Sequence, residues 1–225
     1  MANRNLIIIP TYNESENISD LIEAIFRLTL PFEILIVDDN SSDGTAQIVK
    51  KKQEIYPETL YLMERPEKLG LGTAYITGFK YGLKNNYDYI YEMDADFSHN
   101  PEDLIRLYVA CNTEGYDLAI GSRYIKGVNV VNWPMGRVLM SYCASMYVRL
   151  ITGIPIYDTT AGFKCYHKSV LQAIDLNALQ FLGYAFQIEM KFNAWKRGFP
   201  VSYTHLRAHE TDSYLVCRLL LEKKK

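Results

Sequence analysis

Two aspartates stand two positions apart in the stretch Met93-Asp94-Ala95-Asp96, directly after an apolar run. Hard divalent cations such as Mg²⁺ and Mn²⁺ prefer oxygen ligands, and Mg²⁺ usually takes one or two carboxylates together with substrate phosphates. Asp94 and Asp96 are therefore candidate ligands of a metal ion that carries a phosphorylated substrate. A solvated acidic turn is the alternative interpretation of such a pair taken alone.

Two further polar stretches follow apolar runs that are long enough for a strand. Thr11-Tyr12-Asn13-Glu14 comes after residues 6–9, and Asp38-Asp39 comes after residues 34–37. A carboxylate at the end of a strand can hold a ribose hydroxyl, although a helix-capping or turn pair is the simpler interpretation of Asp38-Asp39. Because ligands of parallel sheets bind outside the carboxyl ends of strands, we expect all three polar stretches to form one site.

A glycine-containing stretch, Gly70-Leu71-Gly72-Thr73-Ala74, precedes a predicted helix. Glycines at the start of a helix allow the backbone to approach a phosphate closely. The stretch is not a P-loop, because no Gly-Lys-Ser/Thr sequence follows it, and the absence of G-x-G-x-x-G after the first strand argues against a dinucleotide enzyme.

The elements that must position these residues alternate along the chain. Apolar runs predict strands at residues 6–9, 34–37, 60–62, 89–93 and 118–120, and apolar residues at helical spacing predict helices near residues 18–26, 46–52, 73–83 and 101–109. Strands that alternate with helices indicate an α/β domain with a Rossmann-like, mostly parallel sheet and helices on both faces. We expect one such domain over residues 1–200.

Composition excludes several classes of protein. The formal net charge of −2 over 225 residues gives no reason to expect a nucleic-acid partner. The chain begins without a signal-peptide pattern and contains no run of about 18 apolar residues, the length that spans a bilayer. The four cysteines show no Cys-x-x-Cys spacing, so we interpret them as reduced thiols and expect a cytoplasmic protein.

The last 25 residues look foreign to the rest of the chain. Residues 201–211 and 215–222 resemble the in-frame translation of a transposon-type sequencing adapter, and the final lysines resemble a translated A-run. We therefore interpret residues 201–225 as a non-native tail and exclude His205, His209 and Cys217 as candidate metal ligands. A natural basic C-terminal helix is the alternative. We expect the natural protein to continue past Pro200 with a sequence of its own.

The motifs in the first 200 residues together resemble those of family 2 glycosyltransferases of the GT-A fold. Their order and spacing are most similar to polyprenol-phosphate (dolichol-phosphate) mannose synthases. The resemblance covers residues 5–200 and rests on 9–14 (IPTYNE), 36–39 (IVDD), 68–75 (KLGLGTAY), 93–96 (MDAD), 121–124 (GSRY), 158–164 (DTTAGFK) and 186–190 (FQIEM).

This resemblance implies a role for each residue at a matching position. The base and ribose of the nucleotide would be bound by Pro10, Tyr12, Glu14, Val37 and Asp39. The metal (Mg²⁺ or Mn²⁺) and the diphosphate would be held by Asp94, Ala95 and Asp96. Ser98 stands where relatives often have Gln, and it would contact the sugar. The phosphates of the sugar donor or of the acceptor would be bound by Arg123, and the acceptor phosphate also by Arg137 and Ser141.

The resemblance also implies the reaction, which is inverting transfer of mannose from GDP-mannose to a polyprenol monophosphate. The predicted catalytic residues are Asp94, Asp96 and Arg123, with no dedicated general base. Arg137, Ser141, Ser145 and Arg149 lie four apart, on one face of a helix with large apolar residues elsewhere. Such a helix suits a membrane interface, so we expect a peripheral protein on the cytoplasmic face, although an ordinary core helix is the alternative.

Two alternatives remain open. The first is a related transferase that uses UDP-glucose with the same lipid, or that transfers a sugar to a glycan. The second is a nucleotide-binding module without catalysis, for which nucleotide binding would not depend on a metal. The resemblance further implies a basic loop after residue 200 that closes over the phosphates. Since residues 201–225 would replace that loop, we expect this chain to fold and to show weak activity or none.

Overall fold

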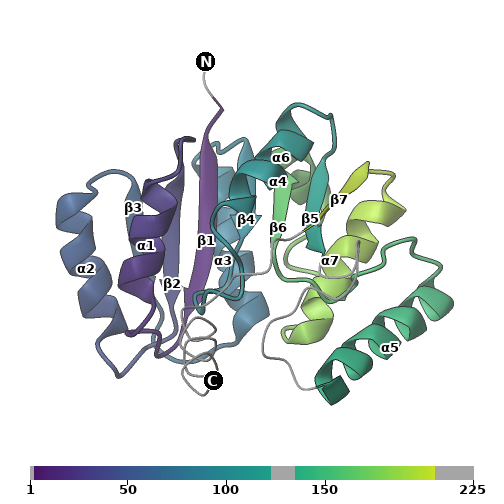
Figure 1. Cartoon of the computed structure of the whole chain (residues 1–225), viewed down its shortest axis with the longest axis horizontal. Coiled ribbons are helices and arrows are strands. Elements are labelled where there is room, and N and C mark those ends of the chain that lie inside the picture. The colour runs from purple at the N-terminus through teal and green to yellow at the C-terminus, as the bar shows by residue number, and fades with distance from the viewer. Residues whose placement is uncertain (1–2, 123–134, 206–225) are drawn as a thin grey trace, which may run out of the picture.

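The computed structural model describes residues 3–122 and 135–205, without the side chains of 135–139, 141, 142, 184, 204 and 205. Within these residues, seven strands form one sheet in the order β3-β2-β1-β4-β6-β5-β7 (Figure 1). The strands are β1 (Asn5–Thr11), β2 (Glu33–Asp38), β3 (Leu60–Glu64), β4 (Tyr89–Glu92), β5 (Leu118–Ser122), β6 (Lys164–His167) and β7 (Val201–His205).

Helices cover both faces of the sheet, as predicted. They are α1 (Ile18–Phe26), α2 (Thr45–Ile55), α3 (Leu71–Lys84), α4 (Asp103–Asn112), α5 (Met135–Thr152), α6 (Lys168–Ala173) and α7 (Tyr184–Lys196). Each central strand serves two cores, because successive side chains of a strand point to opposite faces. In β1, for example, Ile7 and Ile9 pack on the core beneath α1 and α4, whereas Leu6 and Ile8 pack on the core beneath α3 and α7.

The sheet is mostly parallel, which confirms the predicted fold class. Strands β3, β2, β1 and β4 are mutually parallel, and β5 is parallel to β7. Strand β6 lies between β4 and β5 and is antiparallel to both. It therefore brings the loop before Lys164 back to the edge at which β4 ends.

Helix α3 lies unusually close to the sheet. A Cβ atom added to Gly78 would lie 2.6 Å from the side chain of Ile8 on β1, well inside van der Waals contact. A glycine is therefore needed here for packing. This close approach places the first turns of α3 against the carboxyl ends of β1 and β4.

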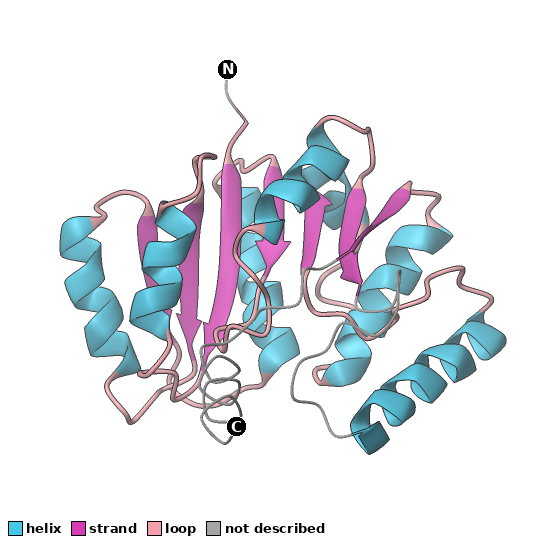
Figure 2. Cartoon of the chain, in the orientation of Figure 1, coloured by secondary structure: helices cyan, strands magenta, loops and turns pink. Residues whose placement is uncertain are grey.

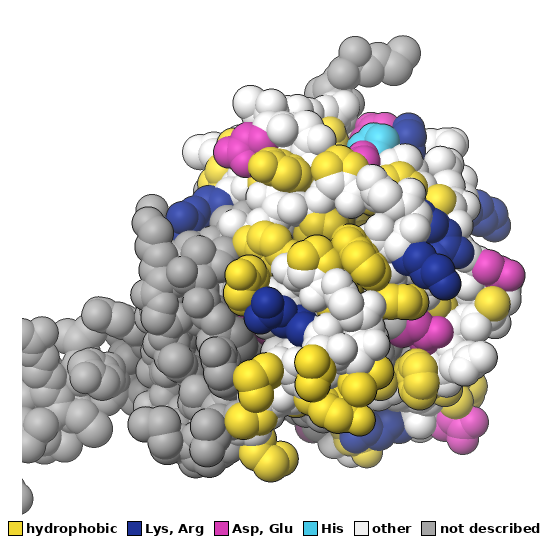
Figure 3. Space-filling view, turned by 90° about the vertical axis from the view of Figure 1, so that its right-hand side faces the viewer, with side chains coloured by type: hydrophobic (Ala, Val, Ile, Leu, Met, Phe, Trp, Pro, Cys, Tyr) yellow, Lys and Arg dark blue, Asp and Glu magenta, His cyan; other side chains and the backbone are white. Residues whose placement is uncertain are grey.

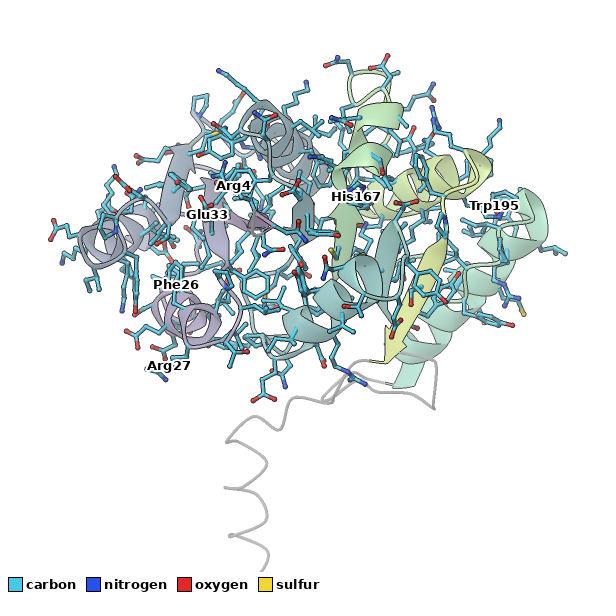
Figure 4. The ribbon with its side chains drawn as sticks, turned by 90° about the horizontal axis from the view of Figure 1, so that it is seen from above. Arg4, Phe26, Arg27, Glu33, His167 and Trp195 are labelled. Carbon is cyan, nitrogen blue, oxygen red and sulfur yellow. The ribbon has the colours of Figure 1, made fainter. Side chains whose placement is uncertain are left out.

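A polar cluster lies at the opposite end of the sheet, where β1 and β2 begin. The Glu33 carboxylate accepts hydrogen bonds from Arg4 Nη2 at 3.0 Å, Tyr61 Oη at 3.1 Å and Tyr87 Oη at 2.5 Å. The Arg4 guanidinium also lies 4.2 Å from the centre of the Tyr87 ring. Arg4 and Glu33 lie side by side in the view from above (Figure 4). The cluster ties β1 to β2 far from the candidate site.

Strand β7 comprises the first five residues of the segment that we interpret as non-native. It pairs with β5 through backbone groups, from Leu118↔Val201 to Ser122↔His205. Every sequence carries such groups, so the origin of residues 201–225 stays a prediction, and residues 206–225 lie outside the described part of the chain. Among the helices of the described residues, none has the length and apolar character needed to cross a membrane.

Candidate functional site

The three polar stretches meet at one edge of the sheet, as expected from the sequence. Strand β1 pairs in parallel with β2 on one side and with β4 on the other. The ends of β1 and β2, marked by arrowheads in Figure 2, point to the same edge. The loop with Glu14 therefore lies between the one with Asp38-Asp39 and the one with Asp94-Ala95-Asp96.

Asp94 is held by Tyr75 and His99. Its Oδ1 accepts a hydrogen bond from the Tyr75 hydroxyl at 3.2 Å, and its backbone N–H donates to His99 Nδ1 at 3.2 Å. Its Oδ2 lies 3.8 Å from His99 Nε2 and would lie 3.6 Å from a Cβ atom added to Gly162. His99 is itself fixed by stacking on Phe163, with ring centres 4.8 Å apart. The Asp94 carboxylate is thus oriented before any ligand binds.

Burial raises the pKa of the Tyr75 hydroxyl well above its ordinary value, and the charge of Asp94 raises it further. The hydroxyl therefore stays protonated at neutral pH, and it is a hydrogen-bond donor to the carboxylate.

Asp96 is exposed and has a different set of contacts. Its Oδ1 accepts hydrogen bonds from the backbone N–H of Ser98 at 3.0 Å and from the Ser98 hydroxyl. Between these residues, Phe97 has a φ of 58°. A bulky residue in this left-handed region costs about 1–2 kcal/mol, and such strain is typical of functional loops. Ser98 thus orients the second carboxylate, and its expected contact with the sugar stays a prediction.

Glu14 completes a concentration of negative charge. Burial raises the pKa of the Glu14 carboxyl above its ordinary value, although a hydrogen bond from Asn17 opposes this shift, and the charges of Asp96, Asp43 and Asp94 raise the pKa further. Repulsion of this kind is relieved when a cation binds. In the part of the chain that the structure describes, no group of three or more His, Cys, Asp or Glu side chains could hold a metal ion. Two carboxylates leave several coordination positions of a cation free, which suits Mg²⁺ or Mn²⁺ that also binds phosphate oxygens.

Asp38 and Asp39 have separate tasks. The Asp38 carboxylate is buried and accepts hydrogen bonds from Thr11 Oγ1 at 2.7 Å and from the Ser41 backbone N–H at 2.9 Å. It therefore connects the loops that follow β1 and β2, which agrees with the structural alternative for this residue. Asp39, the residue expected to bind the nucleotide, forms an ion pair with the buried Arg65.

Arg65 is a site residue that the sequence analysis missed. Its guanidinium donates to Asp39 Oδ1 at 2.5 Å, to Thr73 Oγ1 at 2.7 Å and to the Gly70 carbonyl at 3.3 Å. It joins the end of β2 to the glycine loop and the start of α3. The signal was available, because Arg65 directly follows β3, whose carboxyl end lies at the same edge of the sheet.

The remaining predicted nucleotide contacts differ in exposure. The side chains of Val37 and Ala95 are buried, and Pro10 is half-buried. Tyr12 is 43% exposed, and the Lys68 ammonium lies 3.7 Å from the centre of its ring. Among these four side chains, Tyr12 is therefore the one that is accessible to a ligand. The nucleotide contacts of these residues stay predictions.

The predicted acceptor residues lie outside the described residues. Arg123 lies in the range 123–134, and Arg137 and Ser141 lie within α5 but their side chains are not described. Two other residues of the predicted polar face of α5 are described. Ser145 is buried beside the Thr159 hydroxyl, 3.2 Å away, and the Arg149 guanidinium lies 4.2 Å from the centre of the Tyr157 ring. The described part of this face is thus turned toward the loop that leads to Gly162.

Comparison with known proteins agrees with this arrangement. The model of the family "Glycosyl transferase family 2" matches residues 6–175. A polyprenol monophosphomannose synthase from Mycolicibacterium smegmatis is 44% identical over 198 residues, which are 88% of this chain and 74% of that protein. An undecaprenyl-phosphate mannosyltransferase from Micrococcus luteus is 42% identical over 195 residues, which are 87% of this chain and 79% of that protein.

Solved structures share the fold at much lower sequence identity. Glucosyl-3-phosphoglycerate synthase from Mycobacterium tuberculosis, crystallised with Mn²⁺, UDP and glucosyl-3-phosphoglycerate, aligns with a TM-score of 0.69 and 17% identity. The alignment covers 95% of this chain and 75% of that one. The family match spans most of the chain, including the three loops that carry Glu14, Asp38-Asp39 and Asp94-Ala95-Asp96. The chain is a glycosyltransferase that belongs to glycosyl transferase family 2.

Proposed function

We propose that this chain transfers a mannosyl residue from GDP-mannose to a polyprenol monophosphate, with inversion and with Mg²⁺ or Mn²⁺ as cofactor. The observation that carries the proposal is the convergence of Asp94, Asp96 and Glu14 at one edge of the sheet, beside the Asp39–Arg65 pair. The two mannosyltransferase relatives support mannose as the sugar and a polyprenol phosphate as the acceptor.

The residues of the cleft suggest how the reaction proceeds. Asp94 and Asp96 would hold the metal, which when bound supplies positive charge to the departing diphosphate. Electrostatic stabilisation of this kind is usually the largest single contribution to catalysis. A phosphate oxygen of the acceptor forms the new bond to the anomeric carbon, on the face opposite the leaving diphosphate, while the bond to that diphosphate breaks. The acceptor is already anionic, so it requires positioning by Arg123, Arg137 and Ser141 more than deprotonation.

Two measurements test donor and reaction. Calorimetric titration in Mn²⁺ compares GDP-mannose with UDP-glucose, and we expect GDP-mannose to bind at least tenfold more tightly. A single-turnover assay, with the protein in excess over labelled GDP-mannose, measures label transferred to polyprenol phosphate and extracted into butanol. Because residues 201–225 would replace the loop that closes over the phosphates, we expect only slow transfer of label by the parent chain, and no detectable transfer by Asp96→Ala. Equal transfer by this variant, or tighter binding of UDP-glucose, would contradict the proposal.

Helix α5 supports a further part of the proposal, that the protein works peripherally at a membrane surface, which we expect to be the cytoplasmic face. Its polar Ser145 faces inward at 2% exposure, whereas Leu150 is 82%, Ile151 67% and Tyr147 66% exposed. Hydrophobic side chains gather on this side of the molecule (Figure 3). A helix that turns apolar residues outward suits the boundary between headgroups and acyl chains, where a polyprenol phosphate would present its phosphate.

Vesicle co-sedimentation tests the membrane proposal. The double variant Leu150→Glu/Ile151→Glu should bind phosphatidylglycerol vesicles at least tenfold more weakly than the parent chain, because two charges would enter the apolar boundary. Ile55→Glu/Gln47→Glu is the matched control, because it adds the same two charges at exposed positions of α2, which packs beside β3 at the opposite edge of the sheet. Equal binding by the parent chain and the α5 double variant would refute a role for α5 in membrane contact.

A further inference from the structure

Tyr75 has one feature that packing does not require. Its ring is fully buried and stacks on Phe186 at 6.2 Å and on Phe79 at 6.3 Å between ring centres. A phenylalanine would fill this space equally well. The hydroxyl instead reaches out of the aromatic cluster and donates to Asp94 Oδ1 at 3.2 Å.

The placement of Tyr75 links two parts of the cleft. It lies in the second turn of α3, directly after the glycine loop that Arg65 ties to Asp39. The helix is held against the sheet by the close packing of Gly78 on Ile8. The Tyr75 hydroxyl therefore belongs to a helix that is packed tightly on the sheet, and its position relative to the end of β4 is fixed.

Asp94 and Asp96 differ in how firmly they are held. Asp94 contacts Tyr75 from α3 and His99 from its own loop, and a Cβ atom added to Gly162, in the loop before β6, would lie 3.6 Å from its Oδ2. Asp96 is exposed, and its hydrogen bonds come from Ser98 within the same loop. Hydrogen-bond partners behind a metal ligand fix its orientation, and their removal typically weakens metal binding 10–100-fold.

We propose that Tyr75 is a positioning residue for the metal site, whose hydroxyl holds the Asp94 carboxylate in the orientation that receives the divalent cation. This inference rests on the proposed metal role of Asp94 and Asp96. The residue does not touch the substrate, and it acts through Asp94. Its contribution should therefore appear in metal affinity rather than in nucleotide affinity without metal.

The experiment titrates Mn²⁺ into the full chain in the presence of GDP and measures free Mn²⁺ by electron paramagnetic resonance. Tyr75→Phe should raise the Kd for Mn²⁺ about tenfold. Tyr91→Phe is the matched control, because Tyr91 is also fully buried and its hydroxyl donates to Asn5 Oδ1 at 3.3 Å, away from Asp94. This control should bind Mn²⁺ within twofold of the parent chain. The GDP affinity in EDTA and the melting temperature of Tyr75→Phe should match those of Tyr91→Phe.

Asp94→Asn separates failure of this inference from failure of the proposed function. If Asp94→Asn loses Mn²⁺ while Tyr75→Phe binds it like the parent chain, the metal site stands and the role of Tyr75 is refuted. If Asp94→Asn binds Mn²⁺ unchanged, the proposed metal site fails, and the inference fails with it. Weakened GDP binding by Tyr75→Phe in EDTA would indicate general damage to the cleft and would also overturn the inference.

Discussion

The most demanding prediction concerns Lys164, a fully buried lysine at the start of β6. Lys164 on β6 stands directly opposite Glu92 on β4, and its ammonium lies 3.0 Å from Glu92 Oε1. Both side chains are 0% exposed. Replacement of Lys164 by Met keeps the volume and the apolar stem but leaves the Glu92 charge without its cation.

The structure gives the expected magnitude. Removal of one partner from a buried ion pair typically costs about 3–5 kcal/mol. Glu92 would keep two neutral donors, Tyr166 Oη at 3.0 Å and Gln187 Nε2 at 2.7 Å, so we expect a loss near the lower limit, about 3 kcal/mol. Domains of this size are stable by only about 5–15 kcal/mol, so this is a large fraction of the total.

Urea unfolding followed by circular dichroism measures this loss. The double variant Lys164→Met/Glu92→Gln removes the isolated charge while it keeps an acceptor for Tyr166, and it should recover at least half of the lost free energy of unfolding. Burial lowers the pKa of Lys164, while the charges of Glu92 and Asp94 oppose this shift. A loss below about 1 kcal/mol for the single variant, or a double variant no more stable than the single one, would refute the reasoning.

Three further predictions concern residues outside this pair. Glu33→Gln should lower the free energy of unfolding by about 1–2 kcal/mol, since Tyr87 and Arg4 donate hydrogen bonds to the Glu33 carboxylate. It should leave GDP binding unchanged, because Glu33 lies at the amino end of the sheet and the candidate site at the carboxyl end. Altered GDP binding would contradict this prediction. Burial raises the pKa of Asp43, but hydrogen bonds from Thr45 and Ser15 outweigh it and hold this pKa below its ordinary value. The ionised Asp43 carboxylate therefore adds stability above about pH 4, and this stability is lost as the pH falls further. The difference in melting temperature between the parent chain and Asp43→Asn should accordingly become smaller from pH 7 to pH 3. A difference that stays constant would refute this prediction. Gly72→Ala would place a Cβ atom 2.8 Å from the Leu182 carbonyl, so both the melting temperature and the affinity for GDP with Mn²⁺ should fall; parent-like values would show that this contact is not tight.

Local patterns predicted most of the first half of the fold. The apolar runs that became β1, β2 and β4 are buried on both faces, and Ile18, Leu21, Ile22 and Ile25 line the buried side of α1. Because ligands bind at the carboxyl ends of parallel strands, the loops with Glu14, Asp39 and Asp94 could then be predicted to lie together in one site.

The second half was harder to predict, because charged and polar residues lie where apolar ones are usual. Strand β6 begins with the buried Lys164, and α7 buries Gln187 and Lys191. These side chains are satisfied by partners distant in sequence, such as Glu92 for Lys164 and the Thr159 carbonyl for Lys191. In the first half, Asp39 was predicted but its partner Arg65 was missed, because the two residues follow different strands, β2 and β3. Periodicity carries no signal for such long-range pairs.

The metal dependence of nucleotide binding tests the central claim most directly. GDP is titrated calorimetrically into the parent chain and into Asp96→Ala, each with Mn²⁺ and with EDTA. We predict that Mn²⁺ tightens GDP binding at least tenfold in the parent chain and by less than twofold in Asp96→Ala, because that carboxylate would hold the cation on the diphosphate. Equal affinity with and without Mn²⁺ in the parent chain, or a full metal effect in Asp96→Ala, would contradict the account.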